Sequence, residues 1–298
     1  MSNLVERAAD FVWRTARVLE QHRFAHHYRG ADAEPVARAL GAYRTPEHGY
    51  GFALEPDLRG PIPQPLTAAF ALRMLDDVGL LTSDRVTDLV GHLGSIQRPD
   101  GGLPALHADS ANWPSAQVVP VEADSPGALL STGSIIGLLL RHDVEAPWLP
   151  AAVDFCWAAI EALGATHPYE VESALTFLDA VDDRHRAGRE AERLGELVMK
   201  QRLVPLDPFD CADHPVSPGY SPGEHHFAVE YVTRPSSLAA AWFTPPQLSR
   251  ALDHLAGEQR EDGGWPMRWR NWGPPIEVEW RGVITVDALR VLQGHGRL

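Results

Sequence analysis

The sequence is poor in the features that mark secreted, membrane-spanning and nucleic-acid-binding proteins. Its 298 residues include only two cysteines, Cys156 and Cys211, which do not make a disulfide framework. No run approaches the roughly 18 apolar residues of a membrane-spanning helix, and the N-terminus has no apolar signal core. No basic patch is visible and the net charge is −14, which argues against nucleic acids and anionic membranes as partners. We therefore expect a cytoplasmic protein without a transmembrane segment.

Strand signals are also nearly absent, whereas helical patterns recur along the chain. Few stretches alternate apolar and polar residues, as half-buried strands do. Residues 4–19 have one apolar face at helical spacing, and we interpret residues 1–30 as an N-terminal helix with its lead-in. Further apolar helical runs cover residues 68–75, 86–96, 132–140, 151–163, 171–181, 191–203, 248–259 and 283–292. The predicted class is all-α, in a single domain spanning residues 1–298.

The main pattern is an internal repeat, in which a helix is followed by a glycine-rich turn. Residues 93–104 match residues 255–266 at seven positions without a gap, with a constant offset of 162 (259 minus 97). A weaker copy covers residues 43–52, and degenerate copies are expected around 158–169 and 199–220. The Asp-Gly-Gly of each full copy is a helix stop, because glycine tolerates the left-handed backbone of a C-cap. The repeats predict about five to six helical hairpins, each burying its apolar face against the next.

The second full copy resembles a known family motif. Its residues Gln259-x-x-Asp262-Gly263-Gly264-Trp265 are similar to the QW-type repeat of squalene–hopene and oxidosqualene cyclases. They are equally similar to the repeat in protein prenyltransferase β subunits. The resemblance implies an (α/α) toroid whose inner helices surround a largely apolar cavity. It specifies the fold and leaves the activity open, because one fold hosts many functions.

The acid and metal motifs of those families are missing. Class II terpene cyclases carry an Asp-x-Asp-Asp motif, whose central carboxyl protonates an alkene or epoxide; the nearest string here, ending at Asp183, has one residue too many. Asp76-Asp77 lacks the rest of a class I metal site. Cys211 lies in a proline-rich loop with the wrong spacing for the prenyltransferase zinc site, so no bound metal is expected. Phosphate-binding loops, His-Glu-x-x-His and nucleophile elbows are absent as well.

Carboxylates two positions apart recur in what we expect to be loops ahead of the inner helices. The pairs are Glu55/Asp57, Glu122/Asp124, Glu170/Glu172 and Glu277/Glu279. In a toroid such loops lie at one end of the ring, where desolvation and mutual repulsion raise the pKa of a carboxyl and make it a proton donor. The same pairs could instead hold Mg²⁺ that clamps a diphosphate. They could also simply cap helix N-termini.

Aromatic and arginine side chains are the candidate substrate contacts. Ring faces stabilise cations, so we expect the aromatics near the candidate acids to line the cavity. These are Trp280, Tyr231, Tyr169 and Phe227. Trp265 is interpreted as the packing residue of its repeat. Arg59 and Arg281 could bind a carboxylate or diphosphate, or pair with neighbouring acids.

Three functions remain open at this point. The first is a terpene-cyclase-like enzyme that cyclises or isomerises an isoprenoid or similar apolar small molecule without a cofactor. Its acids would be Glu55 and Asp57, with Glu277 and Glu279 as the second choice. The second is a non-catalytic toroid that binds a hydrophobic ligand or serves as a scaffold. The third is an (α/α) barrel acting on carbohydrates with two carboxylates and sugar-stacking tryptophans. No feature specifies an oligomeric state.

Overall fold

The computed structural model describes residues 3–116 and 124–298. Every regular element in these residues is a helix, and two isolated bridges join Arg44 to Tyr50 and Leu58 to Ser115. The all-α prediction is therefore confirmed. No helix of the described part is both long and apolar enough to cross a membrane. The chain forms two compact units, here named the middle unit (residues 33–164 and 169–190) and the terminal unit (residues 1–32, 165–168 and 191–298).

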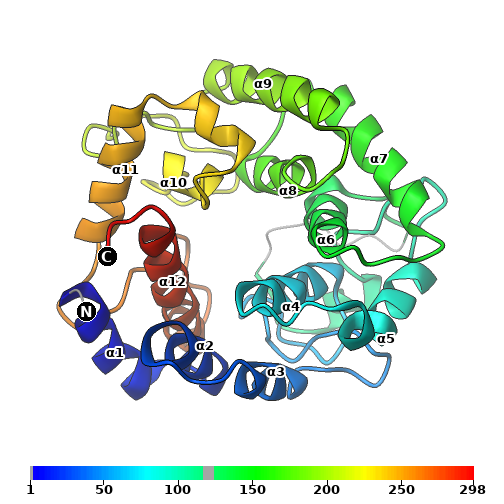
Figure 1. Cartoon of the computed structure of the whole chain (residues 1–298), viewed down its shortest axis with the longest axis horizontal. Coiled ribbons are helices and arrows are strands. Elements are labelled where there is room, and N and C mark those ends of the chain that lie inside the picture. The colour runs from blue at the N-terminus through cyan, green and yellow to red at the C-terminus, as the bar shows by residue number, and fades with distance from the viewer. Residues whose placement is uncertain (1–2, 117–123) are drawn as a thin grey trace. The chain divides into compact units, whose positions relative to one another are not determined.

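The middle unit is built around α6, which is apolar on almost every side. Leucine, isoleucine and glycine dominate α6 (Leu129–Arg141), and it packs against both α4 and α7 (Figure 1). The helices of this unit are α3 (Glu34–Gly41), α4 (Pro65–Asp77), α5 (Ser83–Ser95), α6, α7 (Leu149–Ala162) and α8 (Pro168–Leu178), with a 3₁₀ turn at Ala108–Asn112. A helix apolar all round needs partners on every face, so α6 is the core helix of the unit.

Two glycines of α6 allow α8 to approach it closely. A Cβ on Gly133 would lie 2.7 Å from the carbonyl oxygen of Ser173, and one on Gly137 would lie 2.2 Å from that of Thr176. The Ser173 hydroxyl uses this proximity to donate to the Leu129 carbonyl oxygen at 2.7 Å. Any larger side chain at these positions would push the two helices apart.

The first full repeat fastens the end of α5 to the start of α7. The Gln97 side-chain amide donates to the carbonyl oxygen of Gly101 at 2.8 Å and to that of Trp148 at 3.1 Å. Gly101 has φ of 88°, and a Cβ there would lie 2.4 Å from the Ala151 carbonyl oxygen. The turn thus requires glycine twice over, for its left-handed backbone and for its contact with α7.

The terminal unit holds both ends of the described chain. Its helices are α1 (Asn3–Thr15), α2 (Val18–Arg29), the second part of α9 (Arg184–Lys200), α10 (Ala228–Tyr231), α11 (Pro245–Gly257) and α12 (Pro274–Gly294), with a 3₁₀ turn at Leu238–Trp242. Helix α12 packs against α1, α2 and α11, which surround it in Figure 1.

The second full repeat fastens α11 to α1 by the same contacts. The Gln259 amide donates to the Gly263 carbonyl oxygen at 2.9 Å and to that of Leu4 at 2.8 Å. Gly263 has φ of 92°, and a Cβ there would lie 2.0 Å from the Arg7 carbonyl oxygen. Trp265 is 1% exposed and donates from its indole to the Leu255 carbonyl oxygen, which confirms its packing role. The second full repeat therefore packs against α1 in the same way as the first full repeat packs against α7.

The N-terminal segment differs from its prediction. The described residues from 3 to 30 form two helices and not one, because α1 ends at Thr15 and Arg17 is extended, with ψ of 157°. The Gln21 amide donates to the Ala16 carbonyl oxygen at 3.0 Å, and Arg17 pairs with Glu20 at 2.8 Å. These local polar contacts stop the first helix although the apolar periodicity continues through it.

Candidate functional site

Glu55 lies in a tight, strained loop between α3 and α4. Two residues ahead of it, Phe52 and Ala53, have positive φ values of 53° and 61°, which are unusual for residues other than glycine. The loop is closed by hydrogen bonds from the Ala53 N–H to the Leu58 carbonyl oxygen at 3.1 Å and from the Leu58 N–H to the Glu55 carbonyl oxygen at 3.0 Å. Consecutive strained residues persist where the surrounding structure holds them, commonly at functional sites.

A short antiparallel contact anchors the other side of this loop. The Ala116 N–H donates to the Asp57 carbonyl oxygen at 3.0 Å, and the Arg59 N–H donates to the Pro114 carbonyl oxygen at 3.2 Å. Gly60 faces the ring of Trp113, which a Cβ would approach within 2.5 Å. The loop is therefore fixed by backbone contacts on both sides, and it presents Glu55 and Asp57 as a rigid pair.

The electrostatics of this pair favour a neutral Glu55. Burial raises its pKa, the nearby Asp57 carboxylate raises it further, and Arg73 of α4 opposes them; the result is a pKa of about 8. Glu55 keeps part of its surface accessible, whereas Asp57 is only 6% exposed. A carboxyl with this pKa carries its proton at pH 7, so it is loaded to act as a general acid.

The middle unit also holds two other predicted residues, Arg59 and Tyr169. Arg59 belongs to the same loop and donates from Nη1 to the Pro56 carbonyl oxygen at 3.4 Å. Tyr169, in the first turn of α8, is 39% exposed. Sequence reasoning missed Arg73, although it is the one charged residue among the apolar positions 65–75. Arg73 stacks over the ring of Phe70, with 4.8 Å from its guanidinium carbon to the ring centre.

Two of the predicted carboxylate pairs lie inside helices and not in loops. Glu170 and Glu172 belong to α8, and Glu277 and Glu279 belong to α12. Two residues along a helix turn a side chain by about 200°, so the members of each pair point to opposite sides. Of the three pairs whose residues are all described, only Glu55 and Asp57 lie in a loop, where two neighbouring carboxylates can come close together. Glu122 lies outside the described residues.

The first turns of α12 carry the other residues predicted for the terminal unit. Glu277 lies 3.8 Å from Arg260, and Trp280 packs edge-on against Trp269 with ring centres 5.0 Å apart. The Arg281 guanidinium donates to Asp262 at 2.7 Å and to the Trp265 carbonyl oxygen at 3.1 Å. Arg281 is thus bound to the second full repeat. The sequence analysis offered pairing with a neighbouring acid as one alternative, and Arg281 does pair with an acid, Asp262.

Tyr231 and Phe227 lie around α10 in the core of the terminal unit. Tyr231 is 2% exposed and donates to the Leu203 carbonyl oxygen at 3.3 Å. Phe227 is 4% exposed and has Arg268 and His254 at its ring, at 4.9 and 4.7 Å. Both side chains pack within the protein, and their role as ligand contacts stays a prediction.

Metal ligands do not cluster in the part of the chain that is described. Among these residues, no three His, Cys, Asp or Glu side chains come together in a way that could hold a metal ion. Cys211 donates from its thiol to the Pro208 carbonyl oxygen at 3.3 Å.

No protein-family model and no curated protein matches the sequence. Solved structures of the type II terpene cyclase MstE from Scytonema do match it. A variant bound to its substrate, geranylgeranyl dihydroxybenzoate, aligns with a TM-score of 0.53 and 14% identity over 98% of this chain and 88% of that one. A variant bound to the product merosterolic acid A gives 0.54 and 14% over 99% and 87%. The likeness shows the fold, and the chain has the all-helical toroid fold of a terpene cyclase, as its repeats predicted.

Proposed function

We propose that this protein is an enzyme that cyclises or isomerises an isoprenoid by protonating it, with the Glu55 carboxyl as the acid. The observation that carries the proposal is the position of Glu55 in a strained loop beside the buried Asp57, where burial and the neighbouring carboxylate raise its pKa to about 8. An acid that is neutral at pH 7 holds the proton that the reaction consumes. A carboxyl of ordinary pKa would be ionised and could not donate.

The first step moves one proton and one electron pair. The Glu55 O–H bond breaks, the π electrons of an alkene form the new C–H bond, and a carbocation is left on the substrate. Glu55 becomes a carboxylate, and the anionic Asp57 beside it favours the positive charge that has just formed. The π electrons of a second double bond can then form a ring bond with the cation, which moves the positive charge to a new carbon. Loss of a proton to a base, from the first cation or from the cyclised one, gives the neutral product.

The fold likeness supports an isoprenoid as the substrate. MstE, which shares this fold, is described in complex with geranylgeranyl dihydroxybenzoate as its substrate. A long polyprenyl chain presents several alkenes in series, which suits a reaction that begins with protonation. The proposed substrate is a polyprenyl compound of this kind.

In the middle unit, Arg59 of the Glu55 loop would orient a polar head group of the substrate. The terminal unit holds the second choice of acid with candidate contacts of its own. There Glu277 or Glu279 would be the acid if Glu55 were not, the ring face of Trp280 would stabilise a carbocation, as aromatic faces do, and Arg281 would orient the head group. The helical positions of Glu277 and Glu279 make them single candidates, because they cannot act as a pair.

The test is turnover of geranylgeranyl dihydroxybenzoate by the wild type and by three variants, followed by mass spectrometry. Glu55→Gln should lose at least a thousandfold in rate, because an amide cannot donate the proton. Asp57→Asn should lose less, and Glu277→Gln should keep the wild-type rate. If Glu55→Gln kept full activity and Glu277→Gln lost it, the acid would be Glu277 of α12 and not Glu55. Tight binding with no conversion by the wild type would support the non-catalytic alternative.

A further inference from the structure

A small pocket, here named the Ser110 pocket, lies beside the loop that carries Glu55. Its lining residues all belong to the middle unit and come from two segments, residues 58–64 and residues 110–115. One wall is the antiparallel contact that anchors the loop, in which Leu58 bridges to Ser115. The volume of the pocket is about 10 Å³. Because one enclosed water molecule needs roughly 10–15 Å³, the pocket fits a single water and is too small for a larger ligand.

The Ser110 side chain brings a buried hydroxyl to this pocket. Ser110 is 4% exposed, and its hydroxyl oxygen makes no hydrogen bond to any described residue. Its backbone is held in a 3₁₀ turn, since its N–H donates to the His107 carbonyl oxygen at 3.0 Å and its carbonyl oxygen accepts from the Trp113 N–H at 3.0 Å. A buried hydroxyl without a hydrogen bond lowers the free energy of unfolding, and in native proteins an ordered water commonly satisfies it.

The segment that follows the Glu55 loop supplies nitrogen donors to the same pocket. Gln64 is 5% exposed, and its Oε1 accepts a hydrogen bond from the His107 N–H at 2.7 Å. Because this oxygen is already used, the side-chain amide nitrogen is the group that can donate elsewhere. Arg59 adds a guanidinium, whose Nη1 donates to the Pro56 carbonyl oxygen at 3.4 Å. A water molecule can accept from these two donors and donate to the Ser110 hydroxyl oxygen, within the range of about two to four partners that buried waters have.

We propose that the Ser110 pocket binds one ordered water molecule, which bridges Ser110 to Gln64 and Arg59 and so holds the Glu55 loop in place. A water that bridges two protein groups stabilises nearly as well as a direct hydrogen bond. Ser110 is therefore a positioning residue, which acts on Glu55 through the water and the loop. Its importance for catalysis rests on the proposed function, because only there is Glu55 the initiating acid. A loosened loop lets solvent reach Glu55, and the pKa of its carboxyl should then fall toward the ordinary value.

The chain offers a matched control on α4. Thr67 is 0% exposed, and its hydroxyl oxygen is likewise buried without a hydrogen bond among the described residues, but Thr67 does not line the Ser110 pocket. Thr67→Val removes this hydroxyl and keeps the branched shape of the side chain. Removing a buried hydroxyl that has no partner should stabilise the protein slightly, whereas removing one that binds a water should destabilise it. The two variants therefore have opposite expected effects on Tm.

The experiment combines a crystal structure of the wild type with thermal unfolding of Ser110→Ala and Thr67→Val. The crystal structure should show a water oxygen at about 2.5–3.2 Å from the Ser110 hydroxyl oxygen. Ser110→Ala should have a lower Tm than the wild type, because the water loses one of its partners, and Thr67→Val should have an equal or higher Tm. A pocket that holds no water in the crystal would overturn the inference, and so would a Tm of Ser110→Ala equal to or above that of the wild type.

A second readout tests the link to Glu55 without a turnover assay. The unfolding free energies of Ser110→Ala and S110A/E55Q are compared over a range of pH, as are those of the wild type and Glu55→Gln. The difference within the first pair should level off at a lower pH, because the pKa of Glu55 is lower in a loosened loop. Levelling off at the same pH in both pairs overturns the positioning role of Ser110. If the wild type converts no isoprenoid, the proposed function fails, and these measurements still decide whether a water in the pocket holds the loop.

Discussion

Replacing Glu55 by glutamine should stabilise the protein while it destroys activity. A carboxyl whose pKa is raised from 4.5 to about 8 on folding binds its proton more tightly in the folded state than in the unfolded state. Below pH 4.5 both states are protonated, and the group has no effect on stability. Between these two pKa values only the unfolded state ionises, so the free energy of unfolding falls as pH rises. Above pH 8 both states are ionised and the penalty is constant. Glutamine has no such penalty.

The size of the effect follows from the shift. Each pKa unit corresponds to about 1.4 kcal/mol, so the whole shift would amount to about 5 kcal/mol. Glu55 keeps part of its surface in contact with solvent, and screening reduces the expected value to about 2–3 kcal/mol. The Asp57 carboxylate contributes to the raised pKa of Glu55. In Asp57→Asn the pKa of Glu55 should therefore be lower, and the fall of the unfolding free energy with pH should end at a lower pH than in the wild type.

The assay is urea unfolding of the wild type, Glu55→Gln and Asp57→Asn at every pH unit from 5 to 9. The difference in unfolding free energy between Glu55→Gln and the wild type should grow as the pH rises from 5 and should level off above about pH 8. If the unfolding free energies of the two proteins differed by the same amount at every pH, the raised pKa of Glu55 would be refuted. The assignment of Glu55 as an acid that is protonated at pH 7 would fail with it.

Three further predictions follow from the same structure. Gly137→Ala should destabilise by about 1–3 kcal/mol in thermal unfolding, because its Cβ would meet the Thr176 carbonyl oxygen at 2.2 Å; Gly188→Ala, with nothing within 4 Å, should stabilise slightly. Arg281→Met should lower the unfolding free energy by about 2–3 kcal/mol through its bonds to the second repeat, and a loss confined to substrate affinity would contradict this. The kcat/KM of the wild type should fall tenfold for each pH unit above about 8, as Glu55 ionises, and a flat profile would speak against it.

Much of the fold was predictable because apolar periodicity reports burial directly. Each of the eight internal helical runs corresponds to a helix, from α4 to α9 and then α11 and α12. The short helices α3 and α10 carry too few turns for a periodic signal. The break after Thr15 depends on side-chain bonds from Gln21 and Arg17, which periodicity does not register. The first half of α12 is half-exposed, so its apolar pattern begins late.

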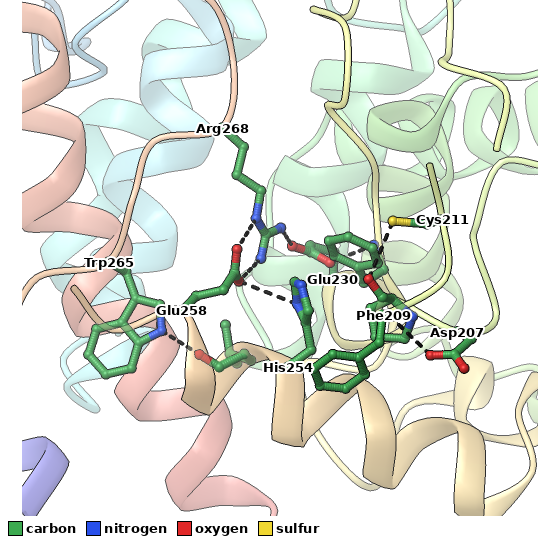
Figure 2. Close-up of polar contacts among 11 residues, drawn as sticks. Asp207, Phe209, Cys211, Glu230, His254, Glu258, Trp265 and Arg268 are labelled. Carbon is green, nitrogen blue, oxygen red and sulfur yellow. Dashed lines mark hydrogen bonds and ion pairs between the residues drawn. The ribbon is translucent and has the colours of Figure 1, made fainter. Parts of the chain in front are cut away.

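The candidate site was predictable only in part. The acidic spacing pointed to Glu55 and Asp57 as the first choice, but it also pointed to Glu277 and Glu279, whose side chains point apart because both residues belong to α12. Spacing alone cannot distinguish a loop, where neighbours can converge, from a helix, where they diverge. The ion pairs of Arg268 with Glu230 and Glu258 (Figure 2) join residues that are far apart in the sequence, and no local sequence pattern predicts them.

The most direct test of Glu55 as the initiating acid is conversion of geranylgeranyl dihydroxybenzoate in D₂O. The wild type should give a product that carries one deuterium on the carbon that was protonated, and Glu55→Gln should give no product above background. A wild-type product without deuterium, or equal deuterium incorporation by Glu55→Gln, would contradict the account.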